Sequence, residues 1–71
     1  MTRRAGTALT PREHDVLNLL QTWLTTREIG ERLHVSTNTV RSHTYAIYRK
    51  LGVSSRREAV ARARARGIIT R

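Results

Sequence analysis

The stretch that decides the fold covers residues 25–52 and has the sequence TTREIGERLHVSTNTVRSHTYAIYRKLG. It begins with Thr25 three positions before Glu28, which is the spacing of a capping box at a helix N-terminus. Two apolar residues then follow four positions apart, so they share one face of a helix. The pattern predicts a short helix over residues 26–33.

A longer helix is expected after a turn at residues 34–35. Ser36 is a favoured N-cap residue, and Gly52 suits the left-handed conformation that ends many helices. Three apolar residues between them are spaced seven and four positions apart and fall on one face, namely Val40, Ile47 and Leu51. A short helix, a tight turn and a longer helix over 37–51 are typical of a helix-turn-helix motif.

The flanking sequence predicts one further helix on each side of this motif. Thr10-Pro11-Arg12-Glu13 is a second capping box, with proline at the first helical position, and it predicts a helix to about residue 22. Ser55-Arg56-Arg57-Glu58 is a third capping box, and the helix that it opens is expected to end at about residue 66, before Gly67.

No segment shows the alternation of a strand, so the sequence predicts an all-α fold with four helices. We expect one domain over residues 9–69, preceded by a flexible basic arm over 1–8 and followed by a short tail over 70–71. With 71 residues in total, such a domain has a thin core and little room for a buried active site.

The charge of the chain limits the classes of partner. Fourteen Lys and Arg residues against five Asp and Glu give a net charge of +9, which attracts polyanions such as nucleic acid. Cysteine is absent, the three histidines lack metal-site spacing, and no nucleophile and base are paired, so we expect no metal, no cofactor and no enzymatic activity. No apolar run is long enough to enter a membrane, and we expect a cytoplasmic protein.

In a helix-turn-helix, the second helix lies in the major groove of DNA with its first residues against base edges. No acidic residue occurs over 36–50, and Arg and Asn are the side chains that pair bidentately with guanine and adenine. The candidate base contacts on the outward face are Asn38, Arg41, Ser42 and Tyr45. The candidate phosphate contacts, at the helix N-termini and further along the second helix, are Thr26, Arg27, Thr37, Thr39, Arg49 and Lys50.

At these residues the sequence resembles a known family. Leu9-Thr10-Pro11-Arg12-Glu13, Glu28-Ile29, Thr39-Val40-Arg41 and Lys50-Leu51-Gly52-Val53 are similar to the LuxR-type (NarL/FixJ, GerE-like) DNA-binding domain. The similarity is greatest to the C-terminal domain of the large ATP-binding LuxR-type regulators.

This resemblance implies sequence-specific binding of double-stranded DNA for transcription regulation on the bacterial nucleoid. It also implies that the helix over 37–51 is the recognition helix and that two copies bind two half-sites through the fourth helix. Ala61 and Ala65 form a face of small residues there that suits a symmetric neighbour. RNA polymerase is a further partner to be considered.

Three positions depart from the family pattern. Trp23 stands where a glycine usually ends the first helix, so we expect that turn to be differently built or strained. Packing of the Trp23 indole against apolar neighbours is the first interpretation, and an exposed anchor for a partner is the second. Gly30 replaces a small alanine at a cost of about 1 kcal/mol in helix propensity. Tyr45 replaces a basic or polar residue that faces DNA.

Other side chains have simpler interpretations. His43 is expected to be a packed, hydrogen-bonded histidine. Arg62, Arg64 and Arg66 are expected to form a solvated surface, because a spacing of two residues spreads them around the helix.

Two other functions remain open at this point. A protein-interaction module with a basic face would show a stable fold that ignores duplex DNA. Binding of promoters in the manner of sigma-factor region four fits the motif, but that region normally lacks a fourth capped helix such as the one that begins at Ser55.

Overall fold

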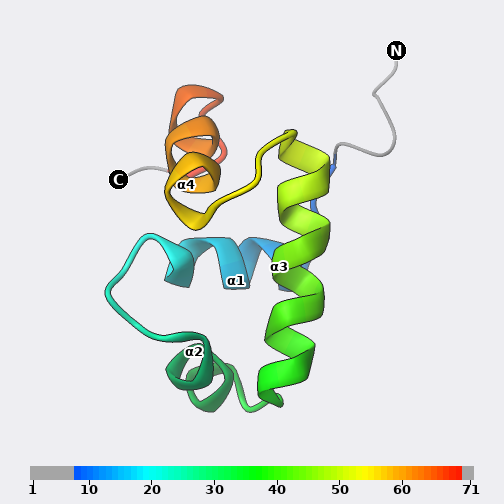
Figure 1. Ribbon diagram of the computed structural model, residues 1–71, viewed down its shortest axis with the longest axis vertical. Coiled ribbons are helices and arrows are strands. Elements are labelled where there is room, and N and C mark those ends of the chain that lie inside the picture. Colours follow the sequence, from blue (N-terminus) through cyan, green and yellow to red (C-terminus); the bar gives the residue numbers. More distant parts are fainter. Residues whose placement is uncertain (1–7, 70–71) are drawn as a thin grey trace.

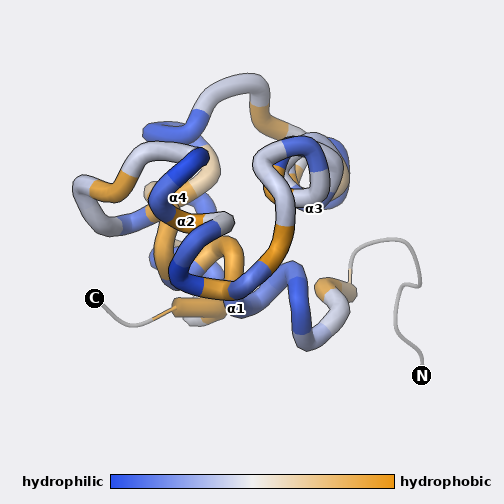
Figure 2. The backbone as a smooth tube through the Cα atoms, turned by 90° about the horizontal axis from the view of Figure 1, so that it is seen from below, coloured by the Kyte–Doolittle hydropathy of each residue, from blue (hydrophilic) through white to orange (hydrophobic). Residues whose placement is uncertain are grey.

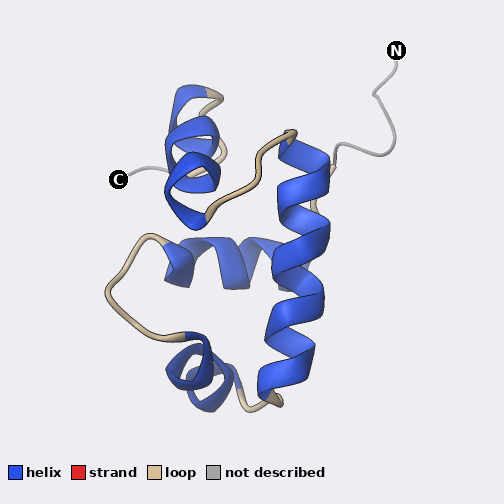
Figure 3. Cartoon of the chain, viewed as in Figure 1, coloured by secondary structure: helices blue, strands red, loops and turns tan. Residues whose placement is uncertain are grey.

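The computed structural model describes residues 8–69, so the arm expected over 1–8, apart from Ala8, and the tail expected over 70–71 lie outside the described residues. The described part contains four helices and no strand (Figure 3). They are α1 (Pro11–Leu20), α2 (Thr26–Leu33), α3 (Thr37–Leu51) and α4 (Arg56–Ala65). The predicted all-α fold with four helices is confirmed.

The longest helix, α3, organises the domain. It lies along one side of the molecule, with α2 near its N-terminal end, α1 across its middle and α4 near its C-terminal end (Figure 1). Both α1 and α3 contact each of the other three helices, whereas α2 and α4 do not contact each other. One side of α3 is therefore covered by the rest of the fold, and its opposite side is left free.

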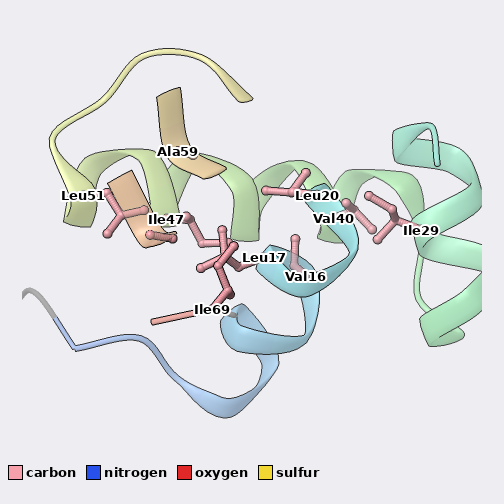
Figure 4. Packing of buried hydrophobic residues seen from close by; sticks show 10 residues of the cluster. Val16, Leu17, Leu20, Ile29, Val40, Ile47, Leu51, Ala59 and Ile69 are labelled. Atoms are coloured by element: carbon pink, nitrogen blue, oxygen red, sulfur yellow. The ribbon is translucent and has the colours of Figure 1, made fainter. Parts of the chain in front are cut away.

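The buried core draws on every helix. The largest fully buried side chains are on α1, α2 and α3, and two alanines from α4 let that helix approach the others closely (Figure 4). The buried apolar residues are Val16, Leu17, Leu20, Ile29, Val40, Ile47, Leu51, Ala59, Ala63 and Ile69. These include the three residues from which the inner face of α3 was predicted.

The predicted N-caps are present, with one difference. Thr10 and Thr25 form complete capping boxes with the glutamates three positions later, and Ser36 Oγ accepts from the Thr39 amide at 3.1 Å. At α4, Ser55 Oγ accepts from the Glu58 amide at 3.1 Å, but the Glu58 carboxylate accepts from the Ser54 amide at 3.0 Å instead of closing a box on Ser55. The predicted third box is therefore wrong in its partner, although the helix begins where expected.

The turn between α2 and α3 depends on a close approach at Gly30. The Val35 amide donates to Gly30 O at 2.9 Å, and His34 takes the left-handed conformation with φ 63°. A Cβ atom at Gly30 would lie 2.7 Å from Val35 O, which is closer than real Cβ contacts. The glycine therefore does more than lower helix propensity, because it lets the turn close onto α2.

Substitution of Gly30 by valine is expected to destabilise the domain by about 2 kcal/mol. The new side chain must displace the backbone of the turn, which outweighs the helix propensity that it gains. The measurement is thermal unfolding followed by circular dichroism. Glu31→Val, at the exposed neighbouring position, is the matched control and should change stability by less than about 0.5 kcal/mol. Equal stabilities of the two variants would contradict the role given to Gly30.

The end of α1 is closed by a side chain from α4. Arg56 Nε donates to Leu20 O at 2.8 Å, and Arg56 Nη2 donates to Thr22 O at 2.9 Å. A guanidinium satisfies the free carbonyls of a helix C-terminus and interacts favourably with its dipole.

Among the described residues, only His34 is a non-glycine with positive φ, so the turn at Trp23 is differently built but not strained.

A second arginine of α4 caps the C-terminus of α3. Arg62 Nη1 donates to Leu51 O at 2.8 Å, close to the left-handed Gly52. Arg64 Nη2 also reaches Gln21 Oε1, at 3.3 Å. The expectation that these arginines form only a solvated surface is therefore wrong for Arg62, and Arg64 also touches α1.

Removal of the Arg56 guanidinium is expected to cost about 2 kcal/mol of stability. Arg56→Ala leaves the last carbonyls of α1 without a charged donor, and hydrogen bonds to charged groups contribute about 1.5–3 kcal/mol each. Chemical denaturation at neutral pH measures the effect, and Arg57→Ala on the exposed side of the same turn is the control. The cap assignment fails if the two variants unfold at the same denaturant concentration.

Candidate nucleic-acid interface

The free side of α3 carries one continuous polar stripe. Figure 2 shows α3 almost end-on, at the edge of the molecule. Five side chains along this helix are exposed and follow one another at helical spacing, namely Asn38, Arg41, Ser42, Tyr45 and Arg49. The structure therefore brings together all four predicted base contacts and one predicted phosphate contact.

The electrostatics of the stripe favour an anionic partner. Residues 36–50 contain no acidic side chain, and Arg41 and Arg49 form no ion pair among residues 8–69. At 1.5 Å per residue, the Cα atoms of these two arginines are about 12 Å apart along the helix axis. The major groove of B-DNA is about 12 Å wide and admits an α-helix.

Tyr45 is the apolar centre of the stripe. Its side chain is 68% exposed, so the fold does not use it for packing. A phenol offers an aromatic surface and a hydroxyl to whatever approaches α3. The exposed ring is therefore not part of the core.

Four predicted phosphate contacts lie in the first turns of α2 and α3. Thr26 and Thr37 are the first residues of their helices and are half-buried, and the Thr39 hydroxyl lies 2.9 Å from Ser36 Oγ in the α3 cap. Arg27 makes a 3.6 Å ion pair with Glu31 in which both side chains are largely exposed. Such surface pairs contribute little, so the Arg27 guanidinium is available to a phosphate.

Lys50 does not fit the phosphate contact predicted for it. Its Nζ lies 2.7 Å from Glu13 Oε1 and 3.1 Å from Ala8 O, and the Lys50 side chain is only 17% exposed. The ammonium group is thus turned inward, where it ties the end of α3 to the start of α1. The structure therefore contradicts the phosphate contact predicted for Lys50.

The carboxylate of Glu13 is held by several groups at once. Burial raises its pKa, but the hydrogen bonds from Lys50 and from the Thr10 amide outweigh burial, and the pKa of Glu13 is lowered overall. A Coulomb interaction with the half-buried His43 lowers the pKa of Glu13 further. This cluster is structural, and it was not predictable from the sequence because Glu13 and Lys50 are 37 positions apart.

The fourth helix and the α1–α2 loop form a separate exposed surface. Ala61 and Ala65 are exposed and lie four positions apart, whereas Ala59 and Ala63 face the core. Trp23 is 101% exposed, so the expectation that its indole packs against apolar neighbours is wrong. The loop before α2 is closed by Thr22 and Arg56, and the indole takes no part in it.

Within residues 8–69, no group of three or more His, Asp or Glu side chains is placed to hold a metal ion. In the same part of the chain, no helix is both long and apolar enough to span a bilayer. An exposed, acid-free face on the second helix of the α2–turn–α3 unit therefore defines this chain as a helix-turn-helix protein.

Comparisons with known proteins give the family. The family of bacterial regulatory proteins named luxR matches residues 7–63. A putative HTH-type transcriptional regulator of Mycobacterium bovis, Mb0914c, is 42% identical over 64 residues, which are 90% of this chain and 7% of that protein. The transcriptional regulatory protein YdfI of Bacillus subtilis is 43% identical over 68 residues, which are 96% of this chain and 32% of that protein.

A solved structure agrees with these sequences. The response regulator ChrA, from a heme-sensing two-component system, superposes with a TM-score of 0.86 at 36% identity, over 97% of this chain and 33% of that one. The chain belongs to the luxR family of bacterial regulatory proteins, which are non-enzymatic DNA-binding regulators of transcription. It spans about a third or less of the length of the relatives and the structure named here.

Proposed function

We propose that the chain binds double-stranded DNA sequence-specifically, with α3 in the major groove. The observation that carries this proposal is the stripe on α3, where every outward side chain is polar or aromatic and none is acidic. In this arrangement Arg41 pairs with guanine O6 and N7, and Asn38 pairs with adenine N6 and N7. Ser42 and Tyr45 contact the neighbouring base edges.

Backbone contacts set the register of α3 in the groove. The charged contacts to phosphates come from Arg27, in the first turn of α2, and from Arg49, in the last turn of α3. The hydroxyls and amides of Thr26, Thr37 and Thr39 add neutral contacts at the helix N-termini, where the helix dipole favours an anion.

We further propose that two copies occupy two half-sites and meet through α4 at Ala61 and Ala65. Small side chains allow the two helices to approach closely. The exposed Arg57 and Arg64 of each copy oppose this contact in the free domain, so pairing requires the negative charge of DNA. Duplexes with one and with two half-sites distinguish this pairing, because only the latter should bind cooperatively.

With this proposed DNA binding, the chain would act on the nucleoid in the cytoplasm, where RNA polymerase is a further candidate partner. These assignments follow from DNA binding and depend on it.

Binding to a random duplex tests the proposal. Fluorescence anisotropy at two salt concentrations should give a Kd of about 10⁻⁴–10⁻⁶ M near physiological salt. With Arg27 and Arg49 as the charged contacts to phosphates, log K should fall by about 1.8 per unit of log salt, since each phosphate contact contributes about 0.9. A folded domain that ignores DNA at low salt would instead favour a protein-interaction module.

A further inference from the structure

A groove lies on the side of the molecule away from α3. It is bounded by the α1–α2 loop and by α4, which both lie on that side in Figure 1, and its volume is about 580 Å³. Trp23 forms one wall, and Val60 and Ala61 contribute the apolar surface of α4. No feature of the DNA-binding face uses this groove.

The apolar part of the groove is exposed without a structural reason. Trp23 is fully exposed, and the α1–α2 turn is held by hydrogen bonds that do not involve its indole. Exposed tryptophans beside small apolar side chains are typical of the centres of protein interfaces. The other large exposed apolar side chain of the described residues, Tyr45, lies on the DNA-binding face.

The charged rim selects the kind of partner. Arg57 and Arg64 line the groove, form no ion pair within residues 8–69, and have no carboxylate beside them among the lining residues. A third arginine, Arg56, adds its charge while it caps α1. A second copy of the chain would bring its own arginines to the same place, and charge repulsion disfavours it there.

From this combination we propose that the groove binds an acidic segment of a partner protein, with one apolar side chain of that segment against Trp23. Its carboxylates pair with Arg57 and Arg64, and its apolar residue covers Trp23 and Val60. The groove lies away from α3, so this binding goes beyond the proposed DNA contact and does not depend on it. Ala61 is shared with the proposed contact between two copies, so the acidic segment competes with that pairing.

The single tryptophan of the sequence makes the proposal directly testable. The probe is a synthetic peptide of alternating glutamate and leucine, added to the full chain while Trp23 emission is recorded. Binding in the groove should shift the emission to the blue. A peptide with glutamine in place of glutamate, and one with serine in place of leucine, should each bind at least about tenfold more weakly.

Variants locate the binding site. With a labelled peptide followed by anisotropy, Trp23→Ala and Arg57→Ala should each weaken binding about tenfold. Circular dichroism should show their fold intact, because both side chains are exposed. Arg32→Ala removes the same charge from α2, outside the groove, and should leave peptide binding unchanged.

Three results would overturn the proposal. The first is peptide binding that neither Trp23→Ala nor Arg57→Ala weakens, which would place the peptide elsewhere. The second is a blue shift that grows with the concentration of the chain alone, which would make a second copy the occupant. The third is a shift produced by duplex DNA but not by the peptide.

Discussion

Lys50→Met is expected to lower the free energy of unfolding by about 3 kcal/mol at neutral pH. The substitution leaves the Glu13 carboxylate, whose side chain is only 7% exposed, without its cation. Removal of one partner of a buried ion pair typically costs about 3–5 kcal/mol, and the Thr10 amide that still binds Glu13 reduces the loss. For a domain of this size the melting temperature should fall by more than about 10 °C.

A matched control isolates the effect of burial. Arg12→Met also breaks an ion pair with an acidic residue on α1, but Arg12 and Asp15 are 3.6 Å apart and both about half exposed. Its effect should be below about 0.5 kcal/mol. If thermal unfolding gives equal losses for the two variants, the Glu13–Lys50 pair has no special structural role.

The pH dependence gives the same prediction a second test. The pKa of Glu13 is lowered in the folded chain, so its stabilising contribution is complete above the ordinary glutamate pKa and is lost as the pH falls through the folded value. Without Lys50, burial dominates and raises the pKa of Glu13. The buried, charged carboxylate then destabilises the fold at neutral pH, and its protonation at acidic pH removes this penalty. The stability difference between the two chains should therefore shrink from about pH 7 to about pH 3.

The sequence predicted those parts of the fold that depend on local chemistry. Capping residues such as Ser36 and the left-handed Gly52 act within one turn of a helix, so their spacing is visible in the chain. The inner face of α3 was also predictable, because Val40 and Ile47 recur with the helical period. The residues on the opposite side of α3 were therefore predicted to form its exposed face.

The contacts between distant segments were not predictable in this way. Arg56 caps α1 from a position 36 residues later than Leu20, and only the packing of α4 brings the two together. Lys50 was predicted to contact a phosphate because the sequence does not show that its ammonium group binds Glu13. The requirement for glycine at position 30 likewise arises from the close approach of the turn to α2.

The same long-range contacts explain the division of charge over the surface. Lys50, Arg56 and Arg62 are bound to carboxylate or carbonyl groups of the fold, which leaves them less available to ligands. Arg41 and Arg49 on α3 and Arg57 beside the groove form no ion pair among residues 8–69. A count of basic residues therefore overestimates the positive charge that is without a partner within the fold.

Arg41→Ala is expected to weaken binding to the preferred site by about 10- to 100-fold, or about 1–3 kcal/mol. The preferred site is first selected from a random pool of duplexes with the full chain. Arg41 is exposed in the second turn of the recognition helix, where side chains reach base edges, and its bidentate pairing with guanine is lost in alanine. Binding to the selected site and to single-base variants of it is measured by anisotropy.

The pattern of losses distinguishes base contact from simple attraction. If Arg41 reads a base, the alanine variant should lose its preference at one position of the site, and Arg41→Lys should lose it as well, because lysine keeps the charge but not the planar fork. Arg66→Ala removes an equal exposed charge beyond α4 and should affect all sites slightly and equally. If Arg41→Ala weakens binding to every site by the same factor, Arg41 contacts a phosphate. The base contacts are then made by Asn38, Ser42 and Tyr45.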